Sequence, residues 1–567
     1  MASSSSDEFE EEVQECAAAV ICCNALTKKR KIWIHEINQN REVSGEYHTL
    51  INLLIKDEER FHTYFRMSRD QFENLQIKEK IRKIDTTIRR ANCTRERLAV
   101  FLRLTLPQLI DCLKEDDDIQ EAHVHILPPE NGNETEVDSD GSDDEHSAKY
   151  QLERLTEAVE DISAKLGTIF KLNLGGTNLI VSTDADHTEA LFRNEGKYPI
   201  RPAFPALLHY RRVNYGSVGV VPGNGEEWYK YRQGVMPLLK ANLVRSYRQK
   251  HEEIADNFVE YIDKNKNRML ILEDVFTHLL KYTIEAISVV SPGHHFQCLS
   301  NYNNNNNKED IIDIITASID FMDGLHRTFT GLPIWKYYKT VGYRKLETSH
   351  KTIHKIVEKH LKELDKDKPE IIQTTNSYMH SLFSNTSYNW NDKLMLSMET
   401  FLGGIDATAT TIAVTLHYLA HNKDVQDLAR SECIQDNTRL PYLRACVKES
   451  LRMCPTGGAN SRVTIADTNI GGYLIPKHTL VLPFSSVTSN KPEYFDKPGV
   501  YRPERWLRDS NCNVHPFASL PFGFGARMCP GRRIAEQEIV VLLMKVSIVA
   551  NILSLLLVCC ITDMIGI

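Results

Sequence analysis

A glycine-rich loop around a single cysteine constrains this chain more than any other stretch. Residues 521–533 read PFGFGARMCPGRR, with glycines at 523, 525 and 531 and one cysteine, Cys529. Glycine adopts backbone conformations that residues with a Cβ atom rarely reach, so the stretch predicts a sharply bent loop. Residues 533–538 then predict a helix whose N-terminus would lie beside the sulfur, where the helix dipole favours a thiolate. The loop therefore predicts an anionic sulfur, suited to binding iron, held close to a flat ligand.

A lone cysteine in a turn is more often a buried structural residue, so the surrounding pattern has to decide between the two interpretations. The pattern F-x-x-G-x-R-x-C-x-G, which begins at Phe522, closely resembles the haem-binding loop of the cytochrome P450 superfamily. In that family the cysteine thiolate is the axial ligand of the haem iron. The resemblance implies that Cys529 binds the iron of haem b, that Arg527 pairs with a haem propionate, and that Phe522 contacts the cofactor.

Length, charge and cysteine usage limit the remaining possibilities. The chain has 567 residues, more than one small domain needs, and its net charge of −8 does not indicate a nucleic-acid-binding protein as a whole. Thirteen cysteines without regular spacing predict neither a disulfide framework nor a zinc site. Residues 1–15 are serine-rich and acidic, which is typical of neither a secretory signal nor a mitochondrial transit peptide.

The N-terminal quarter of the chain differs in character from the rest. Residues 1–110 predict a short helical region, and the runs 30–40 and 58–71 resemble Harbinger-type transposase-derived proteins. Residues 111–150 predict a disordered linker, because residues 115–145 contain thirteen acidic side chains and no lysine or arginine. Residues 111–147 also resemble the acidic leader of piggyBac-derived transposases. These resemblances imply a fusion or a chimeric gene model.

Globular patterning resumes near residue 151, and the cytochrome P450 resemblance covers about residues 163–546. It implies a mainly α fold, with a large helical domain and a small β subdomain, over residues 151–546. Apolar runs at 169–174 and 179–183 flank a glycine-containing turn and predict a β-hairpin. Asp184 is a favourable N-cap for the helix that follows.

Three more residues are implied to bind the haem. Trp228 and Arg232 lie four residues apart on a predicted helix and therefore share one face. The resemblance to the family's W-x-x-x-R motif implies that both hydrogen-bond a haem propionate. Arg462 matches a propionate-binding arginine of the family.

A long, mostly buried helix is predicted over residues 395–421. Two glycines at 403 and 404 would weaken a helix unless something approaches closely. The family carries an acid followed by a threonine here, which deliver protons during dioxygen activation. In this chain the acid is Asp406, but Ala407 stands at the threonine position and Thr408 follows one residue later, rotated by roughly 100° around a regular helix. Asp406 and Thr408 are the implied catalytic residues, and Thr408 can serve only if the helix is locally unwound.

An E-x-x-R motif pairs Glu449 with Arg452 on one face of a predicted helix. Such pairs are usually exposed ion pairs that contribute little to stability. In the family, however, they are joined to an arginine downstream, here Arg505. The resemblance implies a buried network of three charged groups. Losing one member would leave the others uncompensated.

Arg444 and Lys448 place two cations on one face of the same helix. Mitochondrial-type cytochromes P450 carry basic residues at this spacing to dock an acidic, adrenodoxin-like ferredoxin, and Gly531-Arg532-Arg533 also resembles that clan. The resemblance implies membrane association and a place at the mitochondrial inner membrane. No transit peptide is visible to support that location.

The C-terminal residues 547–567 form an atypical apolar tail. Residues 539–561 are almost wholly apolar and about long enough to cross a bilayer. The two interpretations are a membrane segment and a buried helix with a truncated end.

The function implied is a haem-thiolate monooxygenase that inserts one atom of dioxygen into a lipophilic substrate, steroid-like or xenobiotic, with electrons from a ferredoxin. One alternative is a haem-binding chimera that is inactive or uncoupled, or a haem-thiolate isomerase. Another is a transposase-derived protein whose N-terminal helices bind DNA or a partner. The cysteine loop favours the first two hypotheses, and Ala407 and the tail discriminate between them.

Overall fold

The computed structural model describes residues 147–549, apart from the short stretches 175–176, 203, 266–273, 300–307, 331–332, 337, 368–375, 436–437 and 511. Three predictions lie outside the described residues: the transposase-like region, nearly all of the acidic linker and most of the apolar tail.

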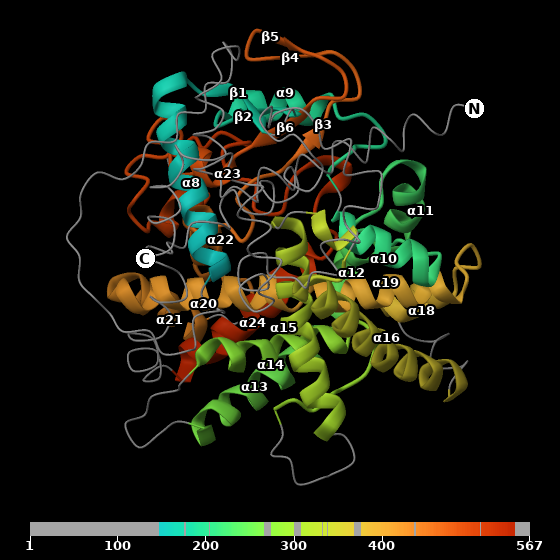
Figure 1. Ribbon diagram of the computed structural model, residues 1–567. Coiled ribbons are helices and arrows are strands. Elements are labelled where there is room, and N and C mark those ends of the chain that lie inside the picture. The colour runs from blue at the N-terminus through green and yellow to red at the C-terminus, as the bar shows by residue number, and fades with distance from the viewer. Residues whose placement is uncertain are drawn as a thin grey trace, which may run out of the picture.

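The β subdomain contains two small sheets, drawn at the top of Figure 1. The larger has the strand order β1-β2-β6-β3, and the smaller pairs β4 with β5. Strands β1 and β2 run antiparallel with Ile169 opposite Ser182, which confirms the predicted hairpin, while β2 and β6 run parallel. The strands are β1 (Ile169–Leu174), β2 (Thr177–Ser182), β3 (Arg462–Val463), β4 (Thr468–Ile470), β5 (Tyr473–Ile475) and β6 (Leu480–Pro483).

Helices make up most of the described chain, as predicted. Those of its first half are α8 (Ser147–Leu166), α9 (Ala185–Arg193), α10 (Pro205–Tyr215), α11 (Gly225–Val235), α12 (Ala241–Ser246), α13 (Arg248–Asn265), α14 (Val275–Ser288) and α15 (Lys308–Thr330). Those of its second half are α16 (Val341–Asp367), α18 (Tyr378–Phe383), α19 (Trp390–Gly403), α20 (Asp406–His421), α21 (Lys423–Gln435), α22 (Pro441–Met453), α23 (Ser485–Thr488) and α24 (Arg532–Val549). Short 3₁₀ turns are η2 (Met236–Leu239), η3 (Pro333–Lys336), η4 (Pro503–Trp506) and η5 (Gly525–Arg527).

The main hydrophobic core lies where α14, α20 and α24 pack against one another. Tyr282 of α14 is fully buried there, and its hydroxyl donates to the carbonyl oxygen of Glu538 in α24 at 2.9 Å. A second cluster packs α8 against the larger sheet through Val159, Phe170 and Leu179. The predicted N-cap is confirmed, because the carboxylate of Asp184 accepts hydrogen bonds from the first backbone N–H groups of α9.

The prediction of one continuous helix over 395–421 is wrong, because α19 ends at Gly403 and α20 begins at Asp406. Between them the backbone N–H groups of Gly404 and Ile405 donate to carbonyl oxygens three residues earlier, at 3.1 and 3.4 Å, which is turn geometry. Gly404 also lies against α14, and a Cβ atom on it would fall 2.4 Å from Cγ1 of Ile287. Close packing against α14 and the weak helix propensity of paired glycines explain the break.

The apolar pattern near the C-terminus lies partly in α24, whose residues Ile539 to Met544 are all buried in the core. Across the residues described here, none of the helices has both the length and the hydropathy that a transmembrane span requires.

Candidate active site

The cysteine loop is bent as its glycines predict. Gly523 and Gly525 have φ values of +68° and +71°, a left-handed conformation that side chains with a Cβ rarely adopt. The backbone N–H of Cys529 donates to the carbonyl oxygen of Phe522 at 2.9 Å, which closes the loop just before α24. Gly531 does not share this conformation, so its backbone does not require glycine.

The environment of Cys529 only partly matches the expected thiolate. Burial raises the pKa of the thiol, while the N–H groups of Gly531 and Arg532 and the charge of Arg232 act in the opposite direction. The net pKa lies above the ordinary value in the haem-free protein, although the N–H groups at the start of α24 favour the thiolate as expected. Desolvation outweighs the dipole here, and a bound metal ion would be needed to hold the sulfur deprotonated.

Four arginines gather beside this loop. Arg527 lies on η5, Arg232 on α11, Arg462 on β3 and Arg201 in the segment before α10. The guanidinium of Arg527 lies 4.1 Å from the ring centroid of Trp228, which is itself 1% exposed. The sequence-predicted residues Trp228, Arg232, Arg462 and Arg527 are thus brought together from three separate segments, α11, β3 and η5.

The hydrogen bonds of these arginines leave part of their donor capacity unused. Arg527 donates from Nε to the carbonyl oxygen of Pro199 and from Nη2 to that of Gly223, both at 2.9 Å. Its Nη1 atom is buried without a hydrogen-bond partner, as is Nε of Arg232. An unpaired buried donor on a cation carries a large desolvation cost, so both groups are suited to receiving an anion.

The positive charge of these arginines is also not balanced by neighbouring carboxylates. Burial and the neighbouring Arg201 and Arg462 lower the pKa of Arg527 to about 8. Burial and Arg462 lower the pKa of Arg201 to about 10. The nearby carboxylate is that of Glu195, which accepts a hydrogen bond from Arg462 Nε at 2.6 Å.

The charge of a second carboxylate, Glu399, also acts on Arg201, but Glu399 already pairs with Arg211. These two carboxylates cannot neutralise all the guanidinium groups, so the cluster suits a ligand that brings negative charge. The donor set therefore fits a haem, whose two propionate carboxylates would supply that charge and whose iron would take the nearby sulfur as a ligand.

The break between α19 and α20 creates an open side of this helix pair. Gly403 has no atom within 4 Å of the place where a Cβ would lie, and both Gly403 and Ala407 are exposed. Thr408 is 2% exposed and so is buried away from that side, while Asp406 is half-buried. The structure thus leaves Ala407, rather than Thr408, on the open side.

The E-x-x-R pair and its downstream arginine form one buried network. Arg452 donates from Nη2 and Nε to the two carboxylate oxygens of Glu449, at 2.9 and 3.0 Å. Arg505 donates to the same carboxylate at 3.0 Å, and the indole N–H of Trp506 does so at 2.8 Å. Glu449 and Arg452 are 0% exposed and Arg505 is 3% exposed, so the three charged groups of the network are buried. It joins α22 to η4.

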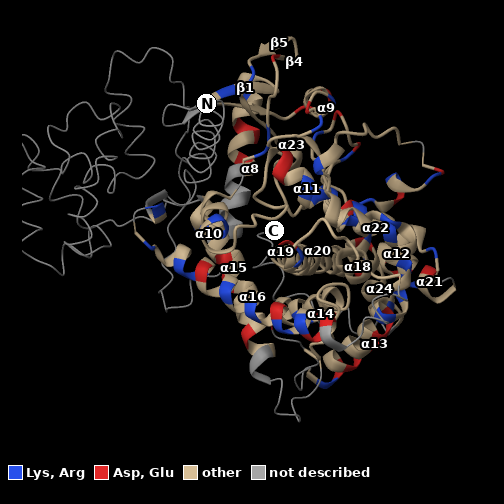
Figure 2. Cartoon of the chain, turned by 90° about the vertical axis from the view of Figure 1, so that its right-hand side faces the viewer, with Lys and Arg blue, Asp and Glu red and all other residues tan. Residues whose placement is uncertain are grey.

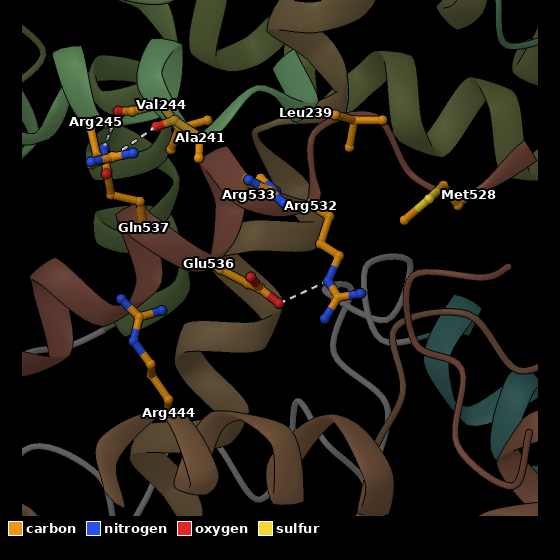
Figure 3. A pocket seen from close by; sticks show the side chains of 10 residues that line it. All are labelled: Leu239, Ala241, Val244, Arg245, Arg444, Met528, Arg532, Arg533, Glu536 and Gln537. Carbon is orange, nitrogen blue, oxygen red and sulfur yellow. Dashed lines mark hydrogen bonds and ion pairs between the residues drawn. The ribbon is translucent and has the colours of Figure 1, made fainter. Parts of the chain in front are cut away.

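The predicted docking residues line two adjoining hollows beside the cysteine loop, the larger of which is drawn in Figure 3. Arg444 borders both hollows, whereas the exposed Lys448 borders the second. Phe522 also lines the second hollow, with the guanidinium of Arg532 at 5.4 Å from its ring centroid. The hollows have volumes of about 560 and 420 Å³.

Sequence reasoning missed Arg201 and Glu195. Arg201 donates from Nη2 to the carbonyl oxygen of Val221 at 2.9 Å, and Glu195 binds both Arg462 and the backbone N–H of Ala526. Neither residue belongs to a pattern with recognisable spacing. The prolines on either side of Arg201, at positions 199 and 202, were the available signal for a fixed backbone there.

Comparison with known proteins decides the family. The model of the cytochrome P450 family matches residues 147–546 of the sequence. The chain belongs to the cytochrome P450 family. It is therefore an oxidoreductase of the monooxygenase class, which uses a haem with a cysteine thiolate ligand and dioxygen as co-substrate. This confirms the resemblance to cytochromes P450 that the cysteine loop indicated.

Curated relatives of this cytochrome P450 include mitochondrial members. The chain is 32% identical to the probable cytochrome P450 49a1 of Drosophila melanogaster, over 70% of this chain and 73% of that protein. It is 28% identical to the probable mitochondrial cytochrome P450 12a5 of the same fly, over 69% and 79%. It is 29% identical to the mitochondrial sterol 26-hydroxylase of Rattus norvegicus, over 67% and 76%.

Solved structures share the fold. The retinoic acid-bound cyanobacterial CYP120A1 aligns with a TM-score of 0.57 at 20% identity, over 69% of this chain and 86% of that one. The cytochrome P450 CYP102L1 aligns with a TM-score of 0.58 at 22% identity, over 69% and 90%. Both likenesses agree with a mainly helical domain that carries a small β subdomain.

Proposed function

We propose that this cytochrome P450 hydroxylates a lipophilic, sterol-like substrate with electrons from a ferredoxin, and that Cys529 is the axial ligand of its haem. The observation that carries the proposal is the cluster of four arginines beside Cys529, three of them buried and Arg201 half-buried, whose charge the neighbouring carboxylates do not balance. When bound, haem supplies the iron that activates dioxygen.

The residues of the chain have separate parts in this proposal. Arg232 and Arg527 donate to the propionates from their unpaired N–H groups, and Arg201 and Arg462 add charge beside them. Trp228 holds the guanidinium of Arg527 in place by stacking against it. The network of Glu449 fixes the surrounding backbone, so that the loop keeps its shape. Asp406 is the proposed source of protons on the open side of α19 and α20.

The substrate class and the electron donor are supported by the relatives. The rat relative acts on a sterol, as its name states, and it and the fly relative are named as mitochondrial. The basic hollows next to the cysteine loop favour an acidic donor, because opposite charges steer association. A mitochondrial location follows as part of the same proposal.

Ala407 supports a second candidate, a haem enzyme that consumes dioxygen with poor coupling to hydroxylation. The open side of α20 presents a methyl group where the family has a hydroxyl, and the hydroxyl of Thr408 is buried elsewhere. Under this candidate the chain binds haem as proposed. Part of the electrons it receives reduce dioxygen to species that are released without hydroxylating the substrate.

The first test is the difference spectrum of the full chain, reduced with dithionite under carbon monoxide. We expect a Soret band characteristic of a thiolate-ligated haem, and we expect Cys529→Ser to abolish it while the protein stays folded by circular dichroism. A folded wild-type protein without that band would contradict the proposal. The same band in the serine variant would assign the ligand to another residue.

A further inference from the structure

The two hollows beside the cysteine loop form one basic surface, called here the basic groove. It is lined by five cations, Arg245, Arg444, Lys448, Arg532 and Arg533, and by one carboxylate, Glu536. The cations come from three elements, α12, α22 and α24, of which α24 packs against both of the others (Figure 2). Figure 3 shows the residues that line the larger hollow, among them Arg245, Arg444, Arg532 and Arg533.

Little of this charge is neutralised within the groove. Glu536 accepts a hydrogen bond from Arg532 Nε at 2.9 Å and so is already committed to one cation. Arg245 donates to a backbone carbonyl and to Asn242, and Arg444 donates to the carbonyl oxygen of Arg439 at 3.0 Å, which are neutral acceptors. The groove therefore attracts a ligand with several negative charges.

This chain contains such a ligand in its own sequence. Residues 115–145 carry thirteen aspartates and glutamates without a lysine or arginine, and the described structure begins at residue 147. The acidic stretch is thus tied to the domain that bears the groove by a single short connection.

We propose that residues 115–145 bind the basic groove of the same chain and compete there with the ferredoxin. The inference rests on the proposed function, because it assumes that the ferredoxin uses the same groove. Under it the chain carries its own inhibitor of electron delivery, which an acidic partner must displace.

Reach does not limit this contact. An extended chain spans roughly 3.3 Å per residue, so the start of the stretch can lie roughly 100 Å from residue 147. A folded unit of about 400 residues has a radius of gyration of about 21 Å, so every face of it is accessible to the tether. Tethering also raises the effective concentration to the millimolar range, so a weak interaction becomes populated.

The contact can be tested directly by zero-length carbodiimide cross-linking of the full chain, followed by peptide mass spectrometry. Lys448 is the exposed amine in the groove, and the exposed Lys197, which lines neither hollow, is the matched control. We expect Lys448, and not Lys197, to join carboxylates of residues 115–145 within one chain. The cross-link should disappear at about 0.5 M salt, where charges are screened within a few ångströms.

The functional consequence is tested with two full-length variants and a ferredoxin titrated by calorimetry. In the first, all thirteen acids of residues 115–145 are changed to the matching amides, and we expect the ferredoxin to bind about ten times more tightly. In the second, Arg245→Glu and Arg533→Glu are combined, and we expect at least a tenfold loss of ferredoxin affinity.

The experiments distinguish failure of the self-contact, failure of the competition and failure of the proposed docking site. If Lys448 gives no cross-link or reacts no more than Lys197, the self-contact is overturned, even if the arginine variant shows that the ferredoxin binds the groove. If the amide variant binds ferredoxin as the wild type does, competition is overturned. If the arginine variant keeps full ferredoxin affinity, the proposed docking site itself is wrong.

Discussion

A buried arginine without an anion is costly for a folded protein, because the guanidinium group keeps its proton and its five donors need acceptors. Arg232 shows this most simply. It is 5% exposed, its Nε atom has no hydrogen-bond partner, and burial lowers its pKa. Arg232 therefore lowers the stability of the haem-free protein, and only an anionic ligand that accepts its hydrogen bond offsets this loss.

This reasoning predicts opposite effects of Arg232→Met on two states of the protein. The haem-free variant should unfold at a higher urea concentration than the haem-free wild type, because an unpaired buried charge is removed. The loaded variant should release haem roughly ten- to a hundredfold faster, as expected for a charge-assisted hydrogen bond worth about 1.5–3 kcal/mol. Haem transfer to an apo-globin acceptor measures the second quantity.

The control for this experiment is Arg193→Met, since the Arg193 side chain is 63% exposed and its ion pair is with Glu189, a neighbour one turn away. It should change neither quantity. A structural role for Arg232 would make the haem-free variant less stable, and that result would contradict the prediction.

The side chain at position 407 should set how efficiently electrons are coupled to product formation. Ala407→Thr places a hydroxyl on the open side of α20, at the position where the family has one, so we expect a severalfold rise in product formed per electron pair consumed. Thr408→Val should leave that ratio unchanged, because Thr408 is 2% exposed and lies off the open side. The measurement is product against NADPH in a ferredoxin-supported assay. The reverse ranking of the two variants would assign the hydroxyl role to Thr408.

Among the elements, α22 and η4 are joined by charge rather than by apolar contact alone. Glu449, at the centre of that joint, accepts hydrogen bonds from Arg452, Arg505 and Trp506 while 0% exposed. Removing its charge would leave two guanidinium groups buried without compensation. That is the circumstance in which breaking an ion pair is most destabilising.

We therefore expect Glu449→Gln to lower the free energy of unfolding by about 3–5 kcal/mol. The matched control is Glu260→Gln, whose partner Lys264 also lies one turn away but whose side chain is 72% exposed, and it should cost less than about 1 kcal/mol. Guanidinium denaturation of the haem-loaded variants measures both values. Equal losses in the two variants would show that burial does not set the strength of the pair.

The elements also show how far sequence could predict this structure. Local signals were sufficient for the hairpin of β1 and β2 and for the cap at Asp184, since both depend on neighbours within a few residues. The cysteine loop could be placed because its glycines and its arginine form one dense pattern. The break between α19 and α20 could not, because it depends on how closely Gly404 approaches Ile287, more than a hundred residues away.

The residues of the candidate site also fall into those that the sequence could predict and those that only the structure reveals. Residues that carry a motif of fixed spacing, such as Trp228 with Arg232 or Glu449 with Arg452, were found from sequence. Arg201 and Glu195 were not, because their partners lie in distant segments and only the fold brings them together. The raised pKa of Cys529 was also missed, since desolvation is a property of the assembled structure.

The whole molecule carries an acid sensitivity that no single motif reveals. His251 of α13 is 0% exposed and lies near the buried Glu538, with Nε2 and Oε1 3.6 Å apart. Burial lowers its pKa from 6.5 to about 4. Burial also lowers the pKa of His294 to about 4 and that of His350 well below its usual range. The folded protein thus holds several histidines neutral that the unfolded chain would protonate.

The sign of the effect follows from proton binding. For His251, the unfolded chain binds a proton between pH 6.5 and about 4 that the folded state does not bind, so the contribution of this residue to stability falls as the pH falls through this window. The raised pKa of the neighbouring buried Glu538 acts in the opposite direction. For His251 alone the full loss is roughly 3 kcal/mol, at about 1.4 kcal/mol per unit of pKa shift. We expect His251→Gln to flatten the fall in urea midpoint between pH 7 and pH 4.5, while His295→Gln, whose side chain is 49% exposed, leaves the fall unchanged. An equal slope for wild type and His251→Gln would mean that other buried groups, and not this histidine, set the acid limit of the fold.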